Sequence, residues 1–118
     1  MSLKIGFAAE ELAKDYLTKQ GLTWTKSNYR CRLGEIDLIM RDKTDLVFVE
    51  VRARASNAFG GAIASITHSK RQKLIRTALL YLQTTKLYDK LPCRFDVVSL
   101  DGTPPQITWI RHAFGVDF

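Results

Sequence analysis

The chain has 118 residues and a formal net charge of +6, from 18 Lys and Arg against 12 Asp and Glu. Its length is that of one domain, and 46% apolar and 25% charged residues are ordinary for a globular rather than a disordered chain. No apolar run approaches the roughly 20 residues of a membrane span, and the first residues lack the apolar stretch of a secretory signal. With only two cysteines, Cys31 and Cys93, these features predict a single domain over residues 1–118 in the reducing cytoplasm, with no membrane partner.

Hydrophobic periodicity predicts two helices and five strands. The first helix, over residues 5–20, carries one apolar stripe and ends at Gly21. On it Glu11 points away from the stripe, whereas Glu10 lies at the edge and can reach a site under the helix. The other predicted elements are strands at 22–30, 35–41 and 46–52, a small-residue loop at 55–64 with Gly60 and Gly61 as its flexible point, a helix at 67–84, and strands at 95–100 and 106–111. The order αβββαββ predicts an α/β sandwich with a mixed five-stranded sheet and flanking helices.

The third predicted strand carries the most informative residue. Its alternation separates two sets, Val47, Val49 and Val51 on one face and Leu46, Phe48, Glu50 and Arg52 on the other. Both faces begin apolar, which is typical of a strand covered on both sides. Glu50 stands where another hydrophobic residue is expected, and a buried carboxylate must be paired, protonated or bound to a metal.

The second predicted strand supplies a partner for Glu50. If residues 42–45 form a four-residue hairpin loop, Asp37 lies directly opposite Glu50, and Glu35 lies opposite Arg52. Opposed residues have Cβ atoms about 4.5–5.5 Å apart, and two carboxylates that close repel unless a proton or a cation lies between them. Mg²⁺ or Mn²⁺ suits such oxygen ligands. A five-residue loop would instead put the two acids on opposite faces, and the alternative interpretation is that both acids form ordinary ion pairs or turn caps.

Positive charge is concentrated in the middle of the chain. Between Asp45 and Asp89 seven Lys and Arg accompany a single acid, so this stretch carries the whole net charge. Such a concentration favours a phosphate-backbone partner, with a solvated helix face as the alternative. The residues predicted to contact DNA phosphates without reading sequence are Arg30, Arg32, Arg54, Lys70, Arg71, Lys73 and Arg76.

Several segments together resemble the YraN-type family of bacterial proteins. They are Glu10 with its helix, 28–30, 34–39, 47–52, 59–60, Lys70, 94–98 and 113–114. The resemblance spans nearly the whole chain and implies the restriction-endonuclease-like, PD-(D/E)XK fold, similar to archaeal Holliday-junction resolvases. It implies that Glu10, Asp37 and Glu50 hold Mg²⁺ or Mn²⁺ and that position 52 is the lysine of the motif. Arg52 stands there instead, and because its guanidinium cannot transfer a proton near neutral pH, Lys70 is a candidate substitute.

These features predict a metal-dependent, structure-selective endonuclease that hydrolyses phosphodiester bonds in branched DNA. The resemblance to resolvases also implies a homodimer, because two strands of a junction need two cuts. A catalytically inactive nucleic-acid-binding module of the same fold is the alternative that Arg52 favours, and an interaction protein whose acids form structural ion pairs is a third. Asp96 remains open between a place near the site and a turn or salt bridge.

Overall fold

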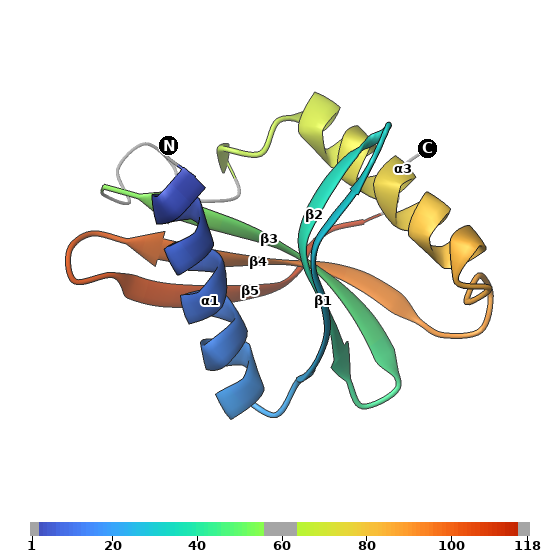
Figure 1. Cartoon of the computed structure of the whole chain (residues 1–118), viewed down its shortest axis with the longest axis horizontal. Helices are drawn as coiled ribbons and strands as arrows, with labels where there is room; N and C mark the ends of the chain where they lie inside the picture. The colour runs from blue at the N-terminus through green and yellow to red at the C-terminus, as the bar shows by residue number, and fades with distance from the viewer. Residues whose placement is uncertain (1–2, 56–63, 116–118) are drawn as a thin grey trace.

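In the structure, a computed structural model that describes residues 3–55 and 64–115, two helices flank a five-stranded mixed sheet (Figure 1). The elements are α1 (Leu3–Lys19), β1 (Thr23–Cys31), β2 (Gly34–Asp42), β3 (Asp45–Arg54), α3 (His68–Thr84), β4 (Cys93–Asp101) and β5 (Gln106–Phe114). The α/β class and the order of the predicted elements are confirmed, with element ends that differ by a few residues. Gly60 and Gly61, the predicted flexible point of the 55–64 loop, lie outside the described residues. Neither described helix is long and apolar enough to cross a membrane.

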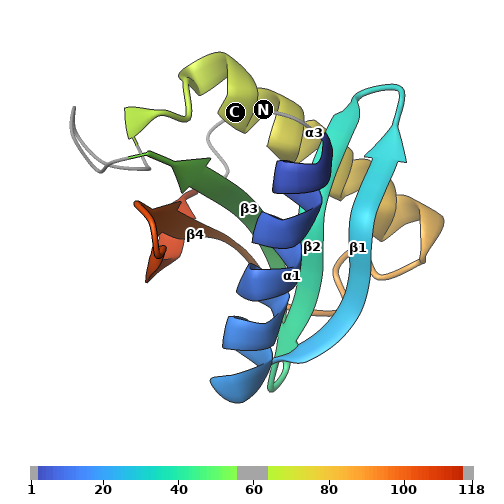
Figure 2. The same ribbon diagram turned by 60° about the vertical axis from the view of Figure 1, so that its left-hand side comes forward.

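The strands follow one another across the sheet in the order β1-β2-β3-β4-β5. Only the β3–β4 pair is parallel, and α3 lies in the connection that such a pair requires. The two helices lie on opposite faces of the sheet (Figure 2), and residues of the central strand β3 are buried in the hydrophobic core on each side. This arrangement explains why both faces of β3 begin apolar.

Each face of the sheet has its own hydrophobic core. On the α1 side the core is built from Ala9, Ala13, Leu17, Leu38, Val47, Val49, Val51 and their neighbours. On the α3 side it contains Ile36, Leu46, Phe48, Leu74, Ile75, Tyr81, Phe95 and others. Phe48 stacks on Phe95 with ring centroids 5.4 Å apart and meets Tyr81 edge to face at 6.0 Å. The two faces predicted for the third strand are therefore confirmed.

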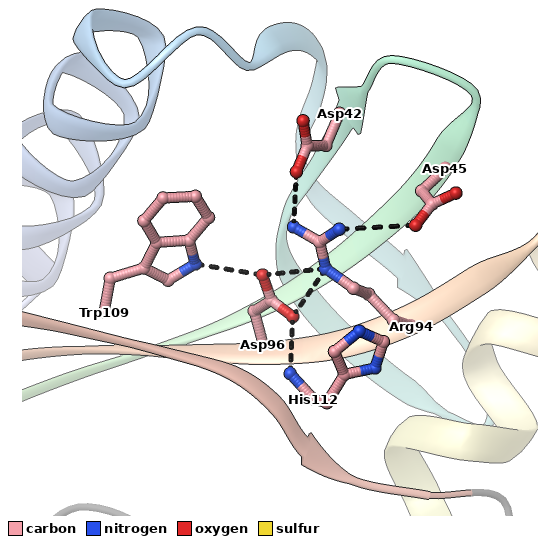
Figure 3. A network of polar contacts seen from close by, with 6 residues as sticks. All are labelled: Asp42, Asp45, Arg94, Asp96, Trp109 and His112. Carbon is pink, nitrogen blue, oxygen red and sulfur yellow. Dashed lines mark hydrogen bonds and ion pairs between the residues drawn. The ribbon is translucent and has the colours of Figure 1, made fainter.

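Asp96 forms a buried ion pair, which settles the choice left open by the sequence (Figure 3). Its carboxylate is fully buried, and Arg94 Nε lies 3.0 Å from Oδ1. The carboxylate also accepts hydrogen bonds from the Trp109 indole N–H at 2.9 Å and from the His112 backbone N–H at 3.1 Å. Because its oxygens are satisfied by these three donors, Asp96 is a structural residue that ties β4 to β5.

Arg94 also reaches the turn between β2 and β3 (Figure 3). Its two terminal nitrogens lie 2.9 Å from an Asp42 oxygen and 3.4 Å from an Asp45 oxygen. These two acids are paired across the hairpin, so the loop is tighter than the predicted four residues while the predicted register is kept. Arg94 compensates two like charges that would otherwise repel directly opposite each other, and so stabilises the register that aligns Asp37 with Glu50.

Candidate metal and phosphate site

The strands β2 and β3 separate where their acidic residues lie. Their ladder of paired residues ends at Leu38 and Val49. At the next step Asp37 Oδ2 accepts the backbone N–H of Val51 at 2.8 Å, so a side chain takes the place of a main-chain acceptor. The Asp37 and Glu50 side chains line one cleft, and their interaction raises the pKa of Glu50. The prediction that these two acids meet is therefore confirmed.

The predicted pairing of Glu35 with Arg52 is wrong. The ladder has already ended at this point, because the Asp37 side chain holds the β3 backbone apart from β2. Glu35 instead forms an ion pair with Arg30, whose Nε lies 3.0 Å from its carboxylate. Both Glu35 and Arg52 nevertheless line the same cleft.

A third acid approaches from the α1 side of the sheet. Glu10 on α1 is partly buried, and its carboxyl group interacts with Asp37 and with the Asn28 side chain. Glu11, one residue further, is exposed, as its place on the helix predicts. Carboxylate oxygens of Glu10, Glu35 and Asp37 all lie within 4.8 Å of one another. Glu35 is a member that the sequence analysis did not assign to the metal site, although its spacing of two residues from Asp37 was a usable signal.

The nearby basic side chains offset only part of the negative charge of the acidic cluster. Burial, followed by the hydrogen bond and the charge of Asp37, raises the pKa of Glu50 to about 9, although Arg52 and Lys70 oppose the shift. Burial and then the Asp37 charge raise the pKa of Glu10 to about 7. Carboxyl groups this close favour a shared proton or a cation between them. Their oxygens are the ligands that hard divalent cations such as Mg²⁺ and Mn²⁺ prefer. The acids whose oxygens lie close enough together to share one cation are Glu10, Glu35 and Asp37, and Glu50 joins them through its interaction with Asp37.

Basic side chains share a cleft with these acids. The cleft has a volume of about 260 Å³ and is lined by Gly34, Glu35, Asp37, Glu50, Arg52, Lys70, Lys73 and Leu74. The helix α3 comes close to the β1–β2 hairpin here, because a Cβ added at Gly34 (φ +156°) would lie 2.9 Å from Thr77 Oγ1. Arg52 Nε is buried and has no hydrogen-bond partner among the described residues. Such a donor suits an anionic ligand in the cleft.

The other predicted phosphate contacts lie outside this cleft. Arg54 is ion-paired with Asp101 at 3.0 Å, and both side chains are largely buried. Arg71 donates from Nε to the Ile66 carbonyl at 3.1 Å, which fixes its guanidinium at the start of α3. The three that remain outside the cleft, Arg30, Arg32 and Arg76, are exposed, and Arg30 is ion-paired with Glu35. The structure thus brings Arg52, Lys70 and Lys73 to the acids and gives Arg54 and Arg71 structural partners.

A mixed five-stranded sheet, with a helix on each face and an acidic and basic cleft where two strands separate, is compatible with the restriction-endonuclease-like α/β fold.

The model of the "Uncharacterised protein family UPF0102" matches residues 9–100. A UPF0102 protein of Legionella pneumophila (strain Philadelphia 1) is 51% identical over 114 residues, which cover 97% of each chain. A UPF0102 protein of Coxiella burnetii (strain RSA 331) is 48% identical over 118 residues, 100% of this chain and 98% of the relative. A UPF0102 protein of Pseudomonas aeruginosa (strain LESB58) is 50% identical over 113 residues, which cover 92% of this chain and 90% of the relative. The chain belongs to the UPF0102 family, which confirms the YraN-type resemblance.

Proposed function

We propose that this protein is a divalent-metal-dependent endonuclease that hydrolyses phosphodiester bonds in branched DNA. The main support is the meeting of Asp37 and Glu50 in a cleft that also contains Arg52 and Lys70. One cavity thus combines carboxylates that can bind a cation with basic side chains that can bind a phosphate, as phosphodiester hydrolysis requires. The preference for branched DNA rests on the resemblance of the motifs to those of resolvases.

Each residue of the site has a role that follows from its contacts. Asp37 and Glu50 hold the cation from neighbouring strands, and Glu10 contributes from α1. The bond from the Val51 N–H fixes the orientation of the Asp37 carboxylate before any ligand arrives. A bound Mg²⁺ or Mn²⁺ polarises the phosphate and activates the attacking water.

The basic residues act on the phosphate rather than on the water. Arg52 and Lys70 offset the negative charge that develops in the transition state. Arg52 cannot act as a general base, because its guanidinium remains protonated near neutral pH. Lys73 and the exposed Arg76 hold the neighbouring backbone phosphates without reading sequence.

Cleavage assays on defined DNA structures test the proposal. Wild type, Asp37→Asn and the exposed control Glu11→Gln are incubated with four-way, flapped and linear DNA, with Mg²⁺, with Mn²⁺ and with EDTA. We expect wild type and Glu11→Gln to cut branched DNA when a divalent ion is present, and Asp37→Asn to bind without cutting. Equal cleavage by Asp37→Asn and wild type would overturn the assignment of the site.

A second candidate function is a nucleic-acid-binding module without catalysis, which the replacement of the motif lysine by Arg52 favours. Its signature is tight DNA binding by wild type and by Asp37→Asn, with cleavage by neither. Arg52→Lys separates the two explanations further. Cleavage that appears only in this variant would show that the arginine silences the site, whereas continued inactivity would count against that idea.

A further inference from the structure

The strand β1 has an unusual backbone conformation beside Glu10. Asn28 has φ +55°, in the left-handed region that few residues other than Gly, Asn and Asp adopt readily. The pairing of β1 with β2 also shifts by one residue between Trp24 and Lys26, which marks a bulge. Irregularities of this kind re-aim side chains and are frequent next to active sites.

In the neighbouring strand β2, side chains two residues apart point to opposite faces of the sheet beside Asn28. Leu38 packs in the core on the α1 side and Ile36 in the core on the α3 side. Residues two apart in a regular strand share a face, so the strand rotates between them. Asp37 lies at this rotation, which allows its carboxyl group to reach both Glu10 from α1 and Glu50 on β3.

Asn28 lies at the matching rotation in β1. Its neighbours Ser27 and Tyr29 are paired with the two β2 residues that face opposite sides. The Tyr29 ring accordingly contacts Tyr81 of α3, with ring centroids 5.1 Å apart. The left-handed backbone of Asn28 therefore belongs to the feature that places the acids together.

We infer that Asn28 is the residue that positions the Glu10 carboxylate within the cation site. Asn28 lies between the Ser27–Leu38 and Tyr29–Ile36 pairs and so stands across from Asp37, whose carboxylate is within 4.8 Å of Glu10. Its side-chain amide interacts with the Glu10 carboxylate, and an amide N–H is a neutral donor that holds a carboxylate beside two other acids without adding charge. Glycine would adopt the same backbone but lacks the amide, and alanine lacks both features. The contact between Asn28 and Glu10 does not depend on the proposed function, whereas its role in binding a cation does.

Two variants separate the amide from the backbone. Asn28→Gly keeps the left-handed conformation and removes the donor. Lys43→Gly is the matched control, because Lys43 is exposed, has φ +58° and lies in the β2–β3 turn. Thermal unfolding first establishes that each variant is folded.

The first readout is the affinity for Mn²⁺, measured by electron paramagnetic resonance. Removing a partner that orients a metal ligand typically lowers metal affinity by roughly 10- to 100-fold, and we expect such a loss in Asn28→Gly but not in Lys43→Gly. Folded Asn28→Gly that binds Mn²⁺ as tightly as wild type would overturn the inference.

The second readout needs neither metal nor activity. In metal-free protein, we expect the side-chain amide resonance of Asn28 to shift in Glu10→Gln and to stay in place in Glu11→Gln. An Asn28 side-chain amide resonance whose chemical shift is unchanged in Glu10→Gln would also overturn the inference. Wild type that binds no Mn²⁺ would instead contradict the proposed function, and the amide resonance then decides the role of Asn28 by itself.

Discussion

Replacing Glu50 by glutamine is expected to remove a pH-dependent loss of stability from the metal-free protein. Because the carboxyl group is buried beside Asp37, its pKa in the folded protein is about 9, against 4.5 for the ordinary side chain. Between these values the folded state keeps a proton that the unfolded chain releases. The stabilising contribution of this proton is fully present below pH 4.5 and is lost as the pH rises towards 9. Glutamine has the shape of the protonated carboxyl group and no proton to lose.

The size of the effect follows from this retained proton. One proton held only by the folded state changes the free energy of unfolding by about 1.4 kcal/mol per pH unit. From about pH 6 to about pH 8 wild type should therefore lose roughly 2–3 kcal/mol more than Glu50→Gln. Glu10, with its pKa raised to about 7, adds a loss of the same sign over the lower part of this range. That second contribution is present in both proteins and largely cancels in the comparison.

Urea unfolding measures this difference. Wild type, Glu50→Gln and the exposed control Glu11→Gln are unfolded in EDTA at both pH values, and then again with saturating Mg²⁺. We expect Glu11→Gln to follow wild type, and Mg²⁺ to flatten the pH dependence of wild type because it binds the deprotonated carboxylates. Equal losses of stability in wild type and Glu50→Gln would refute the reasoning about this buried acid.

Three further predictions address the fold and the cleft. Arg94→Met leaves the fully buried Asp96 without its cation and should lower the free energy of unfolding in urea by about 3–5 kcal/mol; a loss below about 1 kcal/mol would mean that the cluster is not a stabilising unit. Gly34→Ala brings a Cβ to 2.9 Å from Thr77 Oγ1 in a left-handed backbone, and should cost roughly 1–3 kcal/mol in the same assay; an unchanged stability would contradict the close approach of α3 to the hairpin. Lys73→Ala should weaken binding to all DNA shapes alike and lower the slope of log affinity against log salt by about one, and a loss confined to one DNA shape would contradict a backbone contact.

The meeting of Asp37 and Glu50 was predictable because two local rules agreed. The alternation of apolar residues in β3 assigned Glu50 to a buried position, and a short polar turn set the register of the hairpin. The turn closed more tightly than expected, yet the register was unchanged. The sequence pattern was sufficient here because a slip by one residue would have put the two acids on opposite faces of the sheet.

The surroundings of this pair were less predictable. The rotation at Asp37 lies across from one left-handed backbone conformation, that of Asn28, to which an alternation of apolar residues is insensitive. For this reason Glu35 was placed opposite Arg52, although the strands have already separated there. A pattern that assumes regular strands misses the irregular step at which this site is built.

The basic residues show a different limit of sequence reasoning. Arg54 and Arg71 belong to the positive stretch and were predicted to contact phosphate, yet Asp101 and the Ile66 carbonyl hold their guanidinium groups. A count of charges along the chain contains no information about such tertiary partners. Lys70 and Lys73, which were also predicted to contact phosphate, do line the cleft, because residues three apart follow one another along the same side of a helix.

We propose that the carboxylates of Asp37 and Glu50 bind a divalent cation. Crystals of wild type and of Asp37→Asn soaked in Mn²⁺, with anomalous diffraction recorded from both, test it most directly. The account predicts a manganese peak between these two side chains in wild type and its absence in the variant. No peak in the cleft of wild type, or a peak that Asp37→Asn leaves unchanged, would contradict it.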